Sequence, residues 1–146
     1  PSLPPPNPGL LLRVYRGASR LLAPIAPIVL ARRAERGKED PARRDERLGR
    51  SQLSRPDGPV AWIHAASVGE FMAVLPVIDR LRLARADLTL LVTTGTVTSA
   101  GIAAARLGPR AIHQFVPIDT PQAVAGFLDH WKPSLAIFTE SEIWPN

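Results

Sequence analysis

Cysteine is missing from this chain of 146 residues, and histidine is scarce. Without cysteine the protein can have no disulfide framework, no thiolate metal site and no cysteine nucleophile. The three histidines, His64, His113 and His130, are too scattered to indicate a histidine-rich metal site, and we expect no bound metal. No uninterrupted apolar run reaches the roughly 18 residues of a membrane-spanning helix, so a conventional span is not expected.

Two nucleotide-binding motifs are absent as well. The sequence contains neither Gly-x-Gly-x-x-Gly nor Gly-x-x-x-x-Gly-Lys-Ser/Thr, which excludes the dinucleotide fingerprint and the P-loop, and no cofactor is predicted. Disorder throughout the chain is excluded too, because 45% of the residues are apolar and 21% are charged. The length corresponds to about one globular domain.

Positive charge is concentrated in the first part of the chain. Residues 1–58 hold 12 Lys and Arg against 6 Asp and Glu, a net charge of +6, whereas residues 59–146 hold 6 against 7, a net charge of −1; together they give +5. Such asymmetry predicts contact with an anionic partner, for which phospholipid headgroups, a phosphorylated ligand and nucleic acid are the candidates. Nucleic acid is disfavoured, because the basic segment lacks interleaved aromatic residues for stacking and the rest of the chain is neutral.

The first 33 residues indicate a proline-rich lead and an amphipathic helix. Residues 1–8 are rich in proline and predict a flexible lead. Residues 9–33 are largely apolar, and Arg13, Arg16 and Arg20 fall three and four positions apart on one helical face. We interpret this segment as an amphipathic membrane-anchoring helix that lies in the membrane interface and kinks near its two prolines. The alternative is a helix that packs on its own domain.

Residues 34–58 are charged, rich in arginine and poor in apolar side chains. Composition alone favours a basic, solvated linker that contains a short helix. The competing interpretation is a phosphate-facing loop, in which Arg43, Arg44 and Arg47 are candidate contacts.

From residue 59 the pattern alternates between strand and helix. Short apolar runs bounded by loops predict strands, and apolar residues at helical spacing predict the segments between them. The order predicts an α/β domain over 59–146: a Rossmann-like parallel sheet with helices on both faces, whose strands end at a shared ligand-binding edge. Strands are expected at 59–64, 88–93, 112–116 and 133–138, and helices at 71–83, 98–107 and 122–131.

Carboxylates follow the first and last of these strands. Ser67-Val-Gly69-Glu70 has the spacing of a capping box, in which Glu70 satisfies a backbone amide. A carboxylate at this strand end can alternatively act as a general base toward a hydroxyl. Glu140 and Glu142 share one face if the fourth strand continues, or else they belong to a solvated loop or a helix cap.

Hydroxyl side chains follow the second strand in Thr93-Thr94-Gly95-Thr96. They are expected either to cap the next helix or to donate hydrogen bonds to a phosphate or a sugar, and the caps are the simpler interpretation. His64 at the first strand end is expected to be a structural histidine, and Trp62 a packing residue.

Four strings resemble one protein family: Trp62-Ile-His-Ala-Ala-Ser-Val-Gly-Glu70, Val92-Thr-Thr-Gly-Thr-Val-Thr98, Pro117-Ile-Asp119 and Glu140-Ser-Glu-Ile-Trp-Pro-Asn146. They are similar to the N-terminal, acceptor-side part of the 3-deoxy-D-manno-octulosonic acid (Kdo) transferases of lipopolysaccharide synthesis. The resemblance extends over about residues 9–146. One departure is Thr98-Ser-Ala-Gly101, where family members usually show Thr-Gly.

The resemblance implies a GT-B glycosyltransferase with an acceptor domain and a donor domain. It implies transfer of Kdo from CMP-Kdo to lipid IVA, by an inverting and metal-independent reaction, at the cytoplasmic face of the inner membrane. We therefore expect this chain to be a truncated form without the donor domain, and inactive alone. The alternatives are a membrane-peripheral acceptor-binding module without catalysis and a GT-B enzyme that uses another nucleotide-sugar.

The resemblance also implies roles for individual residues. Glu70 corresponds to the general base and Glu140 to a second essential carboxylate. A helix N-terminus favours the anionic form of Glu70, whereas a nearby Glu140 would favour its protonated form. The implied substrate-binding residues are Ser67, Gly69, Thr94, Thr96 and Glu142, and the implied contacts to membrane or acceptor phosphates are Arg13, Arg16, Arg20, Arg43, Arg44 and Arg47.

Overall fold

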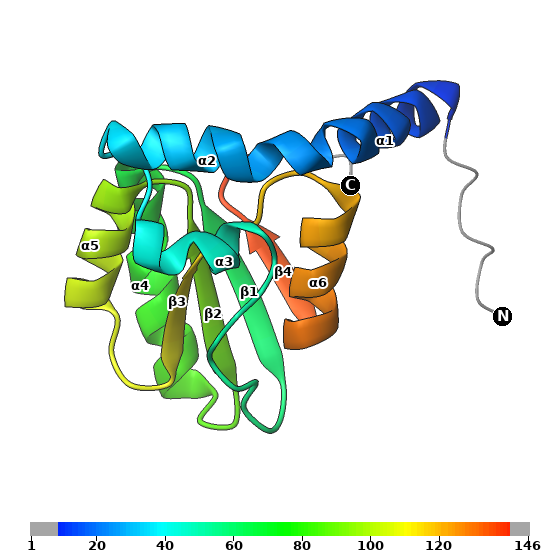
Figure 1. Cartoon of the computed structure of the whole chain (residues 1–146). Coiled ribbons are helices and arrows are strands. Elements are labelled where there is room, and N and C mark those ends of the chain that lie inside the picture. Colours follow the sequence, from blue (N-terminus) through cyan, green and yellow to red (C-terminus); the bar gives the residue numbers. More distant parts are fainter. Residues whose placement is uncertain (1–8, 141–146) are drawn as a thin grey trace, which may run out of the picture.

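A four-stranded parallel sheet organises the chain in the computed structural model, which describes residues 9–140 (Figure 1). The strands lie in the order β3-β2-β1-β4, and each neighbouring pair is parallel. Their bounds are β1 (Val60–Ala65), β2 (Thr89–Thr94), β3 (Ala111–Phe115) and β4 (Leu135–Phe138). The predicted α/β class and parallel sheet are confirmed, and each strand is displaced from its expected bounds by no more than two residues.

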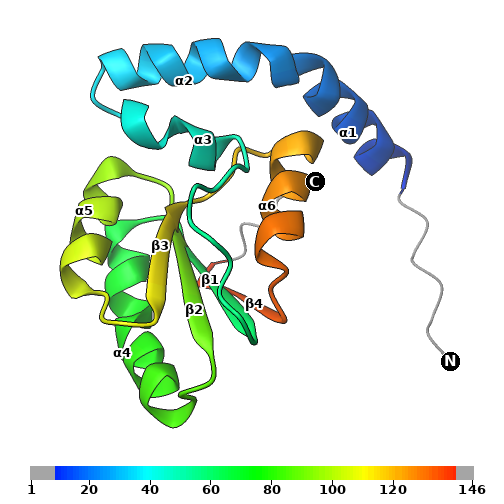
Figure 2. The same cartoon turned by 60° about the horizontal axis from the view of Figure 1, so that its bottom comes forward.

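Helices cover both faces of this sheet, as the alternating pattern predicted. The three connecting helices are α4 (Val68–Ala84), α5 (Val97–Arg106) and α6 (Pro121–Trp131). Figure 2 shows α4 and α5 on one side of the sheet and α6 on the other. Each begins at a hydroxyl N-cap whose side chain accepts a backbone N–H, because the first amides of a helix have no partner within it.

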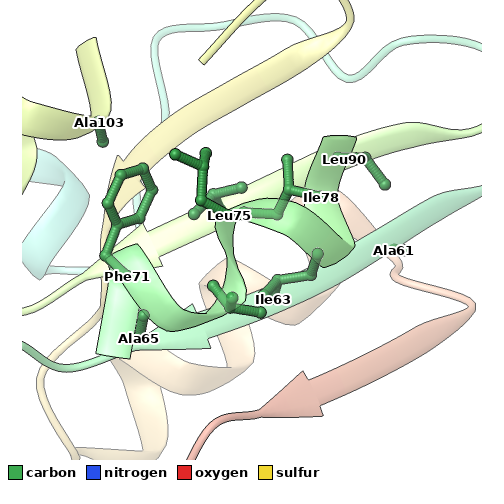
Figure 3. Close-up of a cluster of buried hydrophobic side chains, with 10 residues drawn as sticks. Ala61, Ile63, Ala65, Phe71, Leu75, Ile78, Leu90 and Ala103 are labelled. Atoms are coloured by element: carbon green, nitrogen blue, oxygen red, sulfur yellow. The ribbon is translucent and has the colours of Figure 1, made fainter. Parts of the chain in front are cut away.

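The main core lies between the sheet and the α4–α5 layer (Figure 3). Side chains alternate between the two faces of a strand, so Ile63 of β1 points toward α4 while Trp62 points toward α6. Phe71 of α4 is fully buried in this core, and Trp131 of α6 is fully buried against the opposite face. The first of these layers fixes α4 against the sheet, so that its first turn, which carries Glu70, lies at the carboxyl end of β1.

The strand order creates a topological switch point between β1 and β4. From β1 the chain continues to β2 and then to β3 on one side, and it returns through α6 to place β4 on the other side of β1. In open parallel sheets, ligands bind outside the carboxyl ends of the strands at such a point. The backbone N–H of Thr139 donates to the carbonyl of His64, which continues the β1–β4 ladder to this edge.

A bent helix leads into the domain and lies along the carboxyl-end edge of the sheet (Figure 1). It consists of α1 (Leu10–Leu22), a 3-10 turn η1 (Ala23–Ile25) and α2 (Ala26–Glu35). The break falls at the two prolines, as expected, because proline lacks the N–H that continues an α-helix. Tyr15 of α1 hydrogen-bonds to the carboxylate of Asp119, so the helix is tied to the loop that follows β3.

The segment 39–50 is folded onto the domain, which differs from the solvated linker that its composition indicated. Its helical turns are η2 (Pro41–Arg43) and α3 (Arg44–Arg47). Gly49 has φ +76°, and a Cβ there would stand 1.9 Å from the carbonyl oxygen of Ala123 in α6, so only glycine permits this close crossing. Composition missed the packing because the charged side chains of this segment are paired with one another.

Candidate active site

The Glu70 carboxylate closes a capping box at the start of α4. The backbone N–H of Glu70 donates to the hydroxyl of Ser67, the N-cap, at 3.2 Å. In return, Glu70 Oε2 accepts the backbone N–H of Ala66, the residue before the N-cap, at 2.9 Å, which makes this a variant of the capping box. The capping interpretation is therefore confirmed. Gly69 lies exposed in the same turn, and the Glu70 side chain is half-buried at the carboxyl end of β1.

The same carboxylate is hydrogen-bonded from the neighbouring strand. The hydroxyl of Thr139, the residue after β4, donates to Glu70 Oε2 at 2.7 Å, although the two residues are 69 positions apart in the sequence. A second contact of 3.1 Å joins this hydroxyl to the carbonyl of His64. Glu140 is the next residue and is exposed. The segment that carries Glu70 and the segment that carries Glu140 thus meet at the switch point. Glu142 lies outside the described residues.

The surroundings of Glu70 lower its pKa. Burial alone would raise the pKa, but hydrogen bonding to Ser67, Thr139 and the Ala66 N–H, together with the nearby His64 imidazole, lowers it further than burial raises it. The side chain is therefore a carboxylate at neutral pH and is able to accept a proton.

Packed side chains of β1, β2 and β4 support the site on the face of the sheet that α6 covers. Trp62 Nε1 donates to the Thr93 hydroxyl at 2.8 Å, and His64 Nδ1 lies 2.9 Å from the same oxygen. Phe138 packs edge-on against both rings, with centroid distances of 5.0 Å to Trp62 and 5.7 Å to His64. His64 is buried, which agrees with its expected structural role. Within residues 9–140, no group of three or more histidine or acidic side chains is arranged to hold a metal ion.

The two candidate threonines after β2 differ in their environments. Thr94 is fully buried, and its hydroxyl lies 2.9 Å from His113 Nε2, so the prediction that it contacts a ligand is wrong for this structure. Thr96 is exposed at the same edge and caps α5 by accepting the Ser99 N–H. Thr94 is the last residue of β2 and lies inside the packed sheet, whereas Thr96 lies beyond the strand at the N-cap of α5.

His113 was not singled out by the sequence, yet it connects Thr94 to the basic segment. Arg43 donates to His113 Nδ1 at 3.1 Å, so Nε2 carries the ring hydrogen and the Thr94 hydroxyl accepts it. Burial and the adjacent Arg43 charge lower the pKa of His113 to about 4. The ring is therefore neutral at physiological pH, and this neutral tautomer is what its partners require.

The six candidate arginines fall into two groups. Arg13, Arg16 and Arg20 are exposed along α1, and Arg44 is half-buried. The other two are engaged inside the domain. Arg43 forms a two-bond pair with Glu46 and donates to the His113 carbonyl, and Arg47 is buried against Glu39. A guanidinium held in this way cannot reach a membrane, so the prediction of a membrane or phosphate contact is corrected for both Arg43 and Arg47.

Apolar side chains are left exposed beside these arginines. In α1 no residue is buried, and Leu11 and Leu21 keep more than four-fifths of their surface in solvent. A cleft of about 450 Å³ opens under the bend between α1 and α2, with Leu22, Val29 and Ile118 in its walls. In the part of the chain that the structure describes, no helix is long and apolar enough to cross a membrane.

Comparison with known proteins identifies relatives over most of the chain. The family model described as 3-deoxy-D-manno-octulosonic-acid transferase (kdotransferase) matches residues 42–146. A probable mitochondrial 3-deoxy-D-manno-octulosonic acid transferase of Arabidopsis thaliana is 41% identical over 134 residues, which are 92% of this chain and 30% of the relative. The transferase of Rickettsia bellii is 40% identical over 92% of this chain and 32% of its own length. The chain thus spans about a third of the length of these curated relatives.

Proposed function

The chain belongs to the 3-deoxy-D-manno-octulosonic acid (Kdo) transferase family, and from this membership we propose that it forms the acceptor side of a GT-B glycosyltransferase. The proposed reaction transfers Kdo from CMP-Kdo to lipid IVA. The observation that carries the proposal is the hydrogen bond between Glu70 and Thr139, which brings a carboxylate to the switch point of the sheet. Donor binding is assigned to chain outside these 146 residues.

Glu70 acts as the general base in this proposal. A sugar hydroxyl is a poor nucleophile until its proton is removed, and a positioned carboxylate contributes about 10²–10⁴-fold to such a step. The acceptor oxygen forms a bond to the anomeric carbon of Kdo from the face opposite CMP. The bond from that carbon to the phosphate oxygen breaks, its electron pair leaves with CMP, and the acceptor proton passes to Glu70. The anomeric configuration is therefore inverted.

Other residues are assigned supporting roles in the same proposal. Exposed Glu140 is the second carboxylate, and Ser67, Gly69 and Thr96 surround the acceptor sugar at the strand ends. Glu142 remains a proposed substrate contact from sequence alone. No metal ion or cofactor takes part. Arg13, Arg16, Arg20 and Arg44 are the basic side chains proposed to face lipid or acceptor phosphates.

A transfer assay tests the proposed function. The complete gene product that carries this sequence is incubated with lipid IVA and either CMP-Kdo or a panel of other nucleotide-sugars. We expect transfer from CMP-Kdo only. Transfer from another donor would support a different GT-B enzyme. If the folded protein binds lipid IVA but transfers nothing from any donor, the acceptor-binding module without catalysis is the correct alternative.

We further propose that α1 holds the protein on the cytoplasmic face of the inner membrane. Its exposed leucines and arginines fit an interfacial helix, and burial of a leucine side chain contributes about 1.5–3 kcal/mol. Replacing Leu11 and Leu21 by Glu should weaken sedimentation with phosphatidylglycerol-containing vesicles by about 10²-fold. Leu83→Glu, at an equally exposed position of α4, should change it by less than about two-fold. Equal binding of both variants would refute the assignment to α1.

A further inference from the structure

Two hydrogen bonds converge on one oxygen of the Glu70 carboxylate. The Ala66 N–H and the Thr139 hydroxyl both donate to Oε2, at 2.9 and 2.7 Å, and neither uses Oε1. Because a carboxylate group is planar, fixing Oε2 relative to the Cγ–Cδ bond also fixes the direction of Oε1. The other oxygen is then presented in a fixed direction, which is the arrangement that a proton acceptor needs.

Thr139 is itself held firmly at the end of β4. Its backbone N–H donates to the His64 carbonyl at 3.2 Å, and its hydroxyl lies 3.1 Å from the same carbonyl. A hydroxyl has one hydrogen to donate, and the shorter contact to a charged oxygen takes it. Thr139 thus continues the ladder between β4 and β1 and does not belong to a free loop. The contact of its hydroxyl with Glu70 therefore depends on the pairing of these two strands.

We propose that Thr139 is the positioning residue for Glu70, holding Oε2 so that Oε1 faces the acceptor hydroxyl. This inference rests on the proposed role of Glu70 as general base. Thr139 does not touch the reacting atoms; it acts through the carboxylate that it orients. The Ala66 N–H and the Ser67 hydroxyl constrain Glu70 within its own turn, whereas Thr139 supplies the restraint from the neighbouring strand.

Loss of the Thr139 hydroxyl should change two measurable properties of Glu70. The first is its orientation, and misplacement of a catalytic group by about 1 Å can cost on the order of 10²-fold in rate. The second is its pKa, because one of the hydrogen bonds that lower it is removed. Without that bond the pKa rises, so a higher pH is needed to populate the basic form. The other groups that lower this pKa, the Ser67 hydroxyl, the Ala66 N–H and His64 on β1, stay in place.

Three variants of the complete gene product test the inference, with CMP-Kdo and lipid IVA as substrates. Thr139→Val should lower kcat by about 10- to 100-fold with little change in the KM for lipid IVA, and it should move the acid limb of the pH–rate profile to higher pH. Thr139→Ser restores the hydroxyl and should recover kcat to within about three-fold. Thr89→Val makes the same substitution at the amino end of β2, far from the carboxyl-end site, and should leave both kcat and the acid limb unchanged.

A direct titration of the Glu70 carboxyl by ¹³C NMR accompanies the kinetics. In Thr139→Val the pKa should be higher than in the parent chain, and this readout does not require turnover. If Glu70→Gln abolishes transfer while Thr139→Val leaves kcat and the acid limb unchanged, the positioning role is wrong and the base assignment stands. If Glu70→Gln itself keeps full activity, the proposed function of Glu70 fails first and the positioning role fails with it.

Discussion

Glu70→Gln is expected to lower the rate of Kdo transfer by about 10²–10⁴-fold, because an amide cannot accept the proton of the acceptor hydroxyl. Glutamine has almost the same shape, and its carbonyl oxygen can still accept hydrogen bonds from Ala66 and Thr139. The capping box and the position of α4 should therefore survive. The measurement is kcat with CMP-Kdo and lipid IVA, together with the urea midpoint of the variant.

The pKa of Glu70 gives this prediction a pH dependence. Since the folded protein holds that pKa below its ordinary value, the basic form persists through neutral pH and is lost only as the pH falls through the lowered pKa. With Glu70 as the general base, the parent enzyme should therefore lose activity as the pH falls through this lowered pKa. In Glu70→Gln the residual rate should not show this acid limb.

Asp79→Asn is the matched control for Glu70→Gln. Asp79 lies on the same helix, and its carboxylate is half exposed at 3.4 Å from Arg82. The same carboxylate-to-amide change should alter kcat by less than about two-fold, because exposed ion pairs contribute little. Should Glu70→Gln retain more than about a tenth of the parent rate, Glu70 would be only a helix cap.

Glu39→Gln is expected to destabilise the domain by about 3–5 kcal/mol, because it leaves a buried cation without its partner. Glu39 and Arg47 are both buried, and two hydrogen bonds of 3.0 and 3.1 Å join them. Arg33 of α2 donates to the same carboxylate at 2.8 Å. Arg47 also donates to the carbonyl of Val116, so the pair connects the leading helix to the loop after β3.

Asp45→Asn provides the comparison, because it changes an exposed carboxylate of the same segment that pairs with Arg50. Its effect on the free energy of unfolding in urea should stay within about 1 kcal/mol. Adding Arg47→Met to Glu39→Gln should recover part of the loss, since the uncompensated charge is then removed. A loss for Glu39→Gln no larger than that for Asp45→Asn would mean that water reaches Arg47 and screens it.

The candidate site was only partly predictable. The Ser67–Glu70 capping box was readable because it depends on residues three positions apart, and its geometry follows from helix formation alone. Thr139 was not singled out, although it directly precedes Glu140, because a hydroxyl before an acidic residue carries no local signal. A ligand contact for Thr94 was implied by the family resemblance, and only the packing of His113 against it revealed that its hydroxyl is buried.

By itself the sequence determined the elements of this protein. Helix and strand periods, hydroxyl caps and proline breaks act over a few residues, so the bounds of the strands and the bent leading helix could be read from it. Four motif strings carried the family resemblance. The tertiary structure decided which of those residues meet. Placing β4 beside β1 put Thr139 on Glu70, and folding the basic segment onto the sheet paired Glu39 with Arg47. Such contacts depend on strand order and on the partner that each charge finds, and neither is encoded in the local hydropathy pattern.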